Sequence, residues 1–185
     1  MQNLHYIGIQ SRFNSIEKTP TQQGKIKLLA LLSGPEPQRS VLENKIEKQL
    51  KALGKEAAVV RGSRRAKKKM STNNLTYYNY LRSDELEQLI RNSDFVICRS
   101  GYSTLMDLIK KKKGALLVPT PGQPEQEYLA EYLKARGYFY TVSQNKLNLF
   151  KDLDKASEYH PPDYQNTHYL EDRLKSITGN LRSSY

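Results

Sequence analysis

A turn rich in hydroxyl groups near the middle of the chain has the residue types needed to bind an anion. It follows the apolar run Phe95–Cys98, which is typical of a buried strand, and precedes apolar residues spaced for one face of a helix. A turn at a helix start offers backbone N–H groups and the positive end of the helix dipole. These features suit a phosphate, but an ordinary strand-to-helix turn whose Ser or Thr caps the helix would show the same pattern. The turn consists of Ser100, Gly101, Tyr102, Ser103 and Thr104.

Three polar residues further along the chain are expected near this turn. Asp107 lies about one turn into the predicted helix, where a carboxylate could accept both hydroxyls of a ribose attached to a bound diphosphate. Gln126 and Glu127 open a later helix, and an amide beside a carboxylate suits the hydroxyls of a sugar. Each residue also has a plainer interpretation, because acids are common in the first turn of a helix and on its solvated face. Only their convergence would favour the binding interpretation.

Length, net charge and cysteine count limit the class of protein and the class of partner. A chain of 185 residues suits one well-cored domain, and 30 Lys and Arg against 19 Asp and Glu give a net charge of +11. The charge favours an anionic partner, whether nucleic acid, a lipid surface or a phosphorylated ligand. The single cysteine, Cys98, excludes an internal disulfide and is interpreted as a packed core thiol. No apolar run reaches the roughly 20 residues of a membrane span and no signal peptide is visible, so we expect a cytoplasmic protein.

Alternating strands and helices predict the architecture. Short apolar runs bounded by Gly and Pro are typical of buried parallel strands, and the helical segments between them are long enough to cross a sheet. We therefore expect an α/β fold with a Rossmann-like, mostly parallel sheet flanked by helices. The predicted strands are 4–9, 27–32, 57–60, 74–81, 95–98, 115–118 and 138–142. The predicted helices are 38–53, one from 83, one ending at 110–113, 125–136 and two near 145–157 and 168–178.

In this architecture, ligands gather beyond the carboxyl ends of the strands. Four segments are expected to converge there, namely Ser33-Gly34, Arg82-Ser83, Ser100-Gly101 and residues 119–127. We expect residues 1–150 to form the Rossmann-like domain. Residues 151–185 are expected to form a polar, helical tail that packs on or beside it.

Several local features follow from side-chain patterns. Ser83 is expected to cap its helix, Gly114 to stop the helix before it, and the basic segment 61–70 to form a mobile loop. Helix 38–53 is expected to turn a set of aliphatic residues inward, namely Val41, Leu42, Ile46, Leu50 and Leu53.

The pattern resembles a known family, the C-terminal, donor-binding half of the GT-B glycosyltransferases. Within it, the similarity is greatest to the MurG-like enzymes that add N-acetylglucosamine to the lipid-linked peptidoglycan precursor. The resemblance covers residues 75–142 well and the rest loosely. The matching residues are Ser93–Gly101, Thr104, Asp107, Leu117–Pro119 and Gln126–Tyr128.

The resemblance implies a role for most of the candidate residues. The turn from Ser100 to Thr104 would hold the diphosphate of a UDP-sugar, and Asp107 stands where the family has a ribose-binding Glu. The backbone around Arg82-Ser83 would contact the uracil. Gln126 would bind hydroxyls of the sugar.

Three positions depart from the family or resemble it only loosely. Glu127 stands where the MurG-like enzymes have a second Gln, which leaves the sugar open. Ser33-Gly34 replaces a Gly-Gly-Ser turn, so a phosphate contact is less secure there. Arg12, which follows Gly8, resembles an Arg that approaches the diphosphate in the segment joining the two halves of these enzymes.

The resemblance also implies a mechanism and partners. Such enzymes move a sugar from a nucleotide diphosphate to an acceptor hydroxyl, and backbone dipoles and an Arg can stabilise the leaving diphosphate without a metal or other cofactor. Asp152 and Asp154 form an Asp-x-Asp pattern, but in a Lys-rich helical stretch, so we expect no metal site there. The general base would belong to an N-terminal half, so no catalytic residue is assigned and the chain is expected to need that acceptor domain or a partner subunit. The acceptor of the MurG-like enzymes is lipid-linked, which implies a location peripheral to the membrane.

Two other classes of function stay open at this point. Segment 61–69 is basic enough for nucleic acid, although it lacks the interleaved aromatics that stack on single strands. A nucleotide-sugar epimerase would share the Rossmann layout and would convert a UDP-sugar without an acceptor.

Overall fold

One mixed but mostly parallel sheet forms the centre of the molecule. The computed structural model describes residues 8–13, 26–62, 69–72 and 74–163. The strand order is β3-β4-β2-β1-β5-β6-β7, and every neighbouring pair is parallel except β3 and β4. The predicted α/β architecture is therefore confirmed. The strands are β1 Ile26–Leu31, β2 Ala57–Val60, β3 Lys69–Thr72, β4 Leu75–Tyr78, β5 Ser93–Cys98, β6 Ala115–Leu117 and β7 Tyr140–Thr141.

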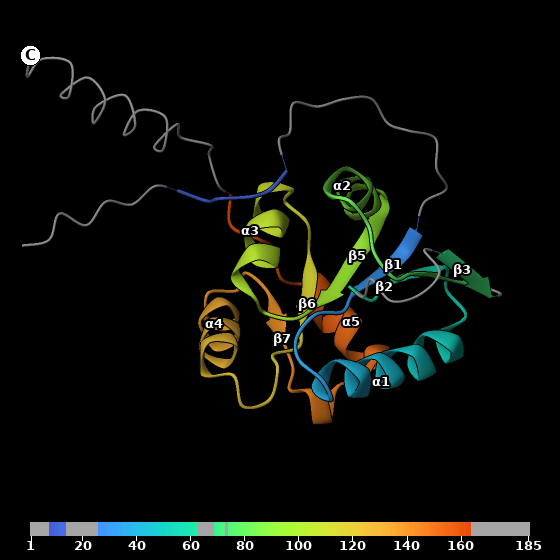
Figure 1. The fold of residues 1–185 in the computed structure, drawn as a ribbon. Helices are drawn as coiled ribbons and strands as arrows, with labels where there is room; N and C mark the ends of the chain where they lie inside the picture. The colour runs from blue at the N-terminus through green and yellow to red at the C-terminus, as the bar shows by residue number, and fades with distance from the viewer. Residues whose placement is uncertain (1–7, 14–25, 63–68, 73, 164–185) are drawn as a thin grey trace, which may run out of the picture.

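Helices cover both faces of the sheet (Figure 1). Helices α2, α3 and α4 pack on one face, and α1 and α5 pack on the other. The helices are α1 Gln38–Leu53, α2 Ser83–Asn92, α3 Tyr102–Lys110, α4 Pro124–Ala135 and α5 Leu149–Ser157, and η1 Gln144–Lys146 is a short 3-10 helix.

The central strands are apolar throughout because both of their faces are buried. In β1, Leu29 and Leu31 pack towards α2, α3 and α4, whereas Leu28 and Ala30 pack towards α1 and α5. This alternation follows from the two-residue period of a strand. It explains why the sequence of the strand reads as one continuous aliphatic run.

Helix α1 has the predicted bounds but not every predicted inward residue. Leu42, Ile46 and Leu50 are buried, at the four-residue spacing of one helix face. Val41, which we expected to be buried, is 48% exposed. It precedes Leu42 by one residue, which turns it about 100° away from that face.

Two predicted helix ends differ from the structure. The N-cap of α2 is Arg82 rather than Ser83, and the backbone N–H of Arg82 donates to Glu85 Oε2 at 2.8 Å. Gly114 is not the left-handed residue after α3, because Lys112 takes that conformation with φ 50°. Glycine is favoured at 114 for another reason, since a Cβ there would lie 3.0 Å from Phe95 Cε2.

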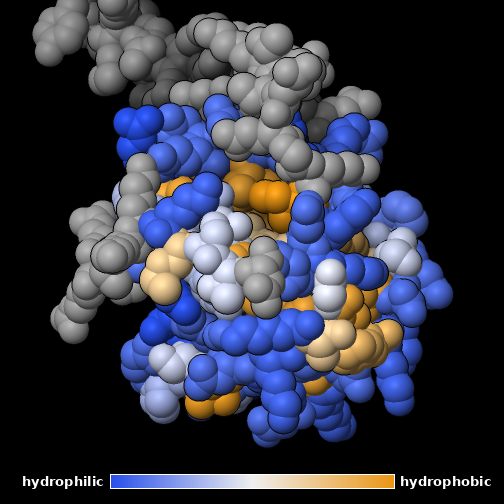
Figure 2. Space-filling model, turned by 90° about the vertical axis from the view of Figure 1, so that its right-hand side faces the viewer, coloured by the Kyte–Doolittle hydropathy of each residue, from blue (hydrophilic) through white to orange (hydrophobic). Residues whose placement is uncertain are grey.

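The basic segment 61–70 is not entirely a loop. Lys69 and Met70 begin β3, an exposed edge strand that pairs with β4, and the predicted loop at 63–68 lies outside the described residues. Figure 2 views the side of the molecule that carries β3 and the end of α1, and hydrophilic side chains cover most of it. A short edge strand that carries a lysine discourages pairing with other strands.

Only part of each end of the chain is described. Gly8 and Ile9 lie in no strand, and the rest of predicted strand 4–9 and the predicted helix 168–178 lie outside the described residues. Helix α5 spans residue 150 and contacts α1, so the division at that residue stays a prediction. In the described part of the chain, no helix has the length and apolarity needed to cross a bilayer.

Candidate functional site

The turn after β5 leads directly into α3, as the sequence predicts. Gly101 is the N-cap residue, and no side chain caps the helix. The alternative that a Ser or Thr of the turn serves as the cap is therefore wrong. The N–H groups of residues 102–104 have no acceptor within the helix. A Cβ on Gly101 would meet no atom within 4 Å, so the space beside this helix start is open.

A hydrogen bond joins this turn to the start of α4. Ser100 is buried, and its Oγ donates to the backbone carbonyl of Gln126 at 2.7 Å. The side chain of Gln126 is held in turn, because the backbone N–H of Thr120 donates to its Oε1 at 3.1 Å and its Nε2 donates to Gln123 Oε1. Two of the predicted segments therefore meet, with the amide of Gln126 fixed inside the β6–α4 loop.

The loop between β1 and α1 also reaches the β6–α4 loop. Gly34 has φ 102°, which favours glycine, and a Cβ there would lie 3.4 Å from Thr120 Oγ1. Ser33 beside it is exposed. The loops after β1, β5 and β6 thus converge at the carboxyl edge, as expected for this architecture.

Arg82 and Ser83 lie further along the same edge. They begin α2 after β4, and β2 and β1 separate β4 from β5 in the sheet. Both side chains are exposed, and Arg82 Nη2 donates to Asp84 Oδ2 at 2.8 Å.

Asp107 is engaged by the N-terminal segment rather than open to solvent. Its carboxylate is 1% exposed and accepts from Ser11 Oγ and from Arg12 Nε, each at 2.7 Å. Phe13 is buried beside these residues, in the core on the α2–α4 face. The structure therefore brings Arg12 and Asp107 together, and the two side chains bind each other.

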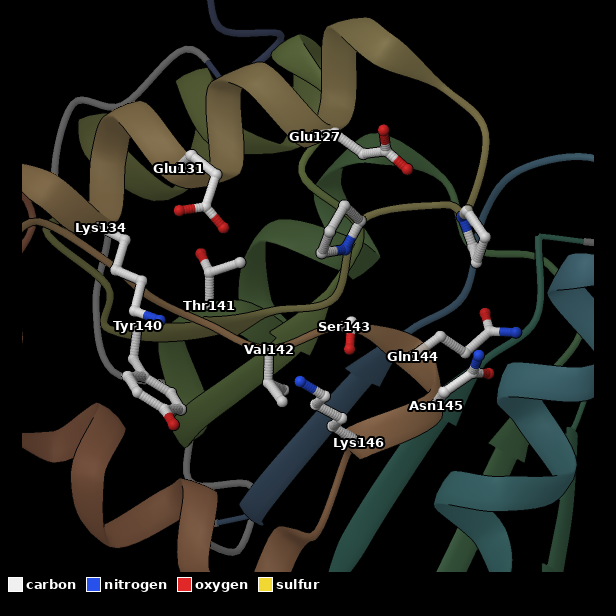
Figure 3. A pocket seen from close by; sticks show the side chains of 12 residues that line it. Glu127, Glu131, Lys134, Tyr140, Thr141, Val142, Ser143, Gln144, Asn145 and Lys146 are labelled. Atoms are coloured by element: carbon white, nitrogen blue, oxygen red, sulfur yellow. The ribbon is translucent and has the colours of Figure 1, made fainter.

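Glu127 lines an open cleft (Figure 3). Its Oε1 accepts from the backbone N–H of Gly122 at 3.0 Å. The cleft has a volume of about 570 Å³ and lies between α4 and the segment from β7 to η1. Glu131 and Lys134 follow Glu127 along the same wall. The sequence patterns did not indicate this cleft, since its walls meet only through the packing of α4 beside β7 and η1.

Arg99 lies at the same edge and was not singled out in the sequence analysis. Its side chain is buried under the carboxyl edge and donates to three backbone oxygens, two after β6 and one at the start of α1. Burial lowers the pKa of its guanidinium to about 10. An arginine between an apolar strand and a Ser-Gly turn was the available signal, because a charge at that position must be either exposed or held by several acceptors.

Two other residues singled out in the sequence have structural roles. Asp152 is buried and accepts from the backbone N–H of Asn148 at 2.7 Å, which fixes the start of α5. Cys98 is buried, and burial raises the pKa of its thiol to about 12. A thiol of that kind stays protonated and unreactive near neutral pH, as expected for a core residue.

Comparison with known proteins agrees with the fold. Residues 37–177 match the glycosyltransferase family 28 C-terminal domain, so the chain belongs to this family. A UDP-N-acetylglucosamine–N-acetylmuramyl-(pentapeptide) pyrophosphoryl-undecaprenol N-acetylglucosamine transferase from Prochlorococcus marinus (strain MIT 9515) is 28% identical over 120 residues, which are 60% of this chain and 32% of that protein. The chain thus spans about a third of the length of this curated relative.

Solved structures show the same fold. The glycotransferase of kitacinnamycin superposes with a TM-score of 0.60 at 13% identity, covering 97% of this chain and 45% of that one. MurG of Acinetobacter baumannii superposes with a TM-score of 0.52 at 16% identity, covering 75% of this chain and 44% of that one. At these identities the likeness concerns the fold, which is one half of a GT-B glycosyltransferase.

Proposed function

We propose that this chain is the half of a glycosyltransferase that binds a UDP-sugar donor. The observation that carries the proposal is the hydrogen bond from Ser100 to the carbonyl of Gln126. It holds the uncapped start of α3 beside the start of α4 at the carboxyl edge. A diphosphate bound by the N–H groups of α3 would then carry its sugar towards Gln126 and Glu127.

The remaining contacts of the donor follow from this placement. The backbone near Arg82 would contact the uracil, and Asp107 would bind the ribose. Because Asp107 is buried and held by Ser11 and Arg12, ribose binding requires this contact to open. Arg12 would then be free to approach the diphosphate.

The chemistry in this half is stabilisation of the leaving diphosphate. The N–H groups and the dipole of α3 face the place where negative charge develops, and they can act there without a metal ion. The general base and the acceptor site would come from an N-terminal half or a partner subunit, in keeping with the third of its relative that this chain spans. The name of that relative suggests a lipid-linked acceptor, and a net charge of +11 would favour an anionic membrane surface.

The other two classes are less well supported. Membership of a glycosyltransferase family does not favour an epimerase, and the basic segment on which nucleic-acid binding would depend lies mostly outside the described residues. Nothing in the described loops favours either class over a donor site.

Calorimetric titration of the 185-residue chain with UDP tests the proposal. Wild-type chain should bind UDP at one site. Gly101→Asp should weaken binding at least about tenfold, because a carboxylate would face the diphosphate at the helix start. Thr72→Asp, which adds the same charge on the exposed strand β3, should not. Absence of UDP binding, or equal effects of the two variants, would contradict the proposal.

A further inference from the structure

A positive charge is buried beneath the carboxyl edge of the sheet. The side chain of Arg99 is 1% exposed, and its guanidinium donates to four oxygen atoms. They are the backbone carbonyls of Val118 and Pro119, each at 3.1 Å, that of Gln38 at 2.9 Å, and Gln144 Oε1 at 2.7 Å. All four acceptors are neutral. Among the described residues, no carboxylate forms an ion pair with Arg99.

This arrangement leaves the charge uncompensated at neutral pH. Burial lowers the pKa of Arg99 to about 10, so the group is still protonated at pH 7. Neutral oxygen dipoles accept from Nη1 and Nη2 without cancelling the net charge, and the buried Nε has no hydrogen-bond partner among the described residues. A charge surrounded by protein is screened much less by water and salt than one on the surface.

The acceptors of Arg99 belong to the segments that frame the proposed donor site. Val118 and Pro119 follow β6 and lead to the loop that holds Gln126, and Gln38 begins α1. Arg99 itself precedes Ser100, whose hydroxyl joins the turn to α4. One side chain therefore fixes three segments and brings a positive charge to their shared edge.

We propose that Arg99 is a positioning residue of the donor site and that its buried charge makes this edge prefer a nucleoside diphosphate to less highly charged nucleotides. The inference rests on the proposed function. Arg99 does not touch the ligand in this scheme. It acts through the loops that it anchors and through its electrostatic field.

The test is the affinity of the full 185-residue chain for uridine, UMP and UDP at constant ionic strength. If Arg99 acts through its charge, Arg99→Gln should lower the affinity for UDP by about tenfold or more and that for uridine by less than about threefold, with UMP between them. A residue that only shaped the loops would affect all three ligands alike. Lys151→Gln removes one exposed charge from α5 and should leave the three affinities nearly unchanged, because water and salt screen it.

A second variant neutralises the charge while Arg99 stays in place. Gln144→Glu puts a carboxylate of nearly the same shape beside the guanidinium, and it should reduce the preference for UDP as Arg99→Gln does. Gln144→Glu can replace Arg99→Gln in the test if Arg99→Gln fails to fold, because Gln144→Glu keeps the arginine and its backbone hydrogen bonds. Equal losses for uridine, UMP and UDP in the folded variants would overturn the inference and leave the donor site intact. Wild-type chain that bound no UDP would overturn the proposed function, and the inference with it.

Discussion

Arg12 Nε and Asp107 Oδ2 lie 2.7 Å apart and join the N-terminal segment to α3. The carboxylate is buried, while the side chain of Arg12 is 46% exposed. Since Ser11 holds the other oxygen, the described N-terminal segment is fastened to the helix that begins at the proposed diphosphate site. The same carboxylate is therefore available either to this segment or to a ribose.

Arg12→Gln should lower the free energy of unfolding by about 1–2 kcal/mol, because it leaves a buried carboxylate without its charged partner, although the exposure of Arg12 lessens the loss. Urea denaturation measures the change. Lys51→Gln cuts the more exposed pair with Glu47 on α1 and should cost less than about 0.5 kcal/mol. Equal losses would show that the contact of Arg12 is an ordinary surface pair.

Ser100→Ala should lower the free energy of unfolding by about 1 kcal/mol, because the carbonyl of Gln126 loses a buried donor. Ser103→Ala, at an exposed position of the same helix start, should stay within about 0.5 kcal/mol. Thermal denaturation of the two variants compares them directly. A Ser100→Ala chain as stable as wild type would mean that this hydrogen bond does not hold the two loops together.

Gly114→Ala should lower the free energy of unfolding by about 1–3 kcal/mol, because its methyl group would press against the ring of Phe95. Phe95→Leu should relieve part of this cost. A double-mutant cycle in urea gives the coupling between the two sites. Additive effects would contradict the close approach.

Alkaline stability should depend on Cys98. Burial raises the pKa of its thiol from 9.0 to about 12, so above pH 9 the unfolded chain ionises while the folded chain stays protonated. Its contribution to stability is complete below pH 9 and is lost as the pH rises towards 12. Between pH 9.5 and 10.5, wild-type chain should lose stability faster than Cys98→Ala by up to about 1.4 kcal/mol per pH unit. Parallel pH profiles would contradict the burial of the thiol.

Local patterns predicted the elements well and their long-range contacts poorly. The bounds of α1 and β2 follow from apolar spacing and turn residues, which are local in the sequence. The exposure of Val41 depends on which face of α1 packs against the sheet, and no local pattern marks Lys112 as the left-handed residue after α3. The preference for glycine at 114 depends on the ring of Phe95, which lies on β5.

In the candidate site, too, the arrangement of the loops was predicted but the individual long-range contacts were not. The meeting of Ser100 with Gln126 was expected, because the carboxyl ends of parallel strands share one edge. The pairing of Asp107 with Arg12 and the four acceptors of Arg99 were not expected. They join residues far apart in the chain, and the spacing of apolar residues does not predict such contacts.

Amide chemical-shift changes on adding UDP test the central claim most directly, since they report both whether UDP binds and where. We predict saturable changes that are largest at residues 101–104, the N–H groups at the start of α3, with smaller changes at Gln126 and Glu127. No change, or changes centred away from the carboxyl edge, would contradict the assignment of this chain as a donor-binding half.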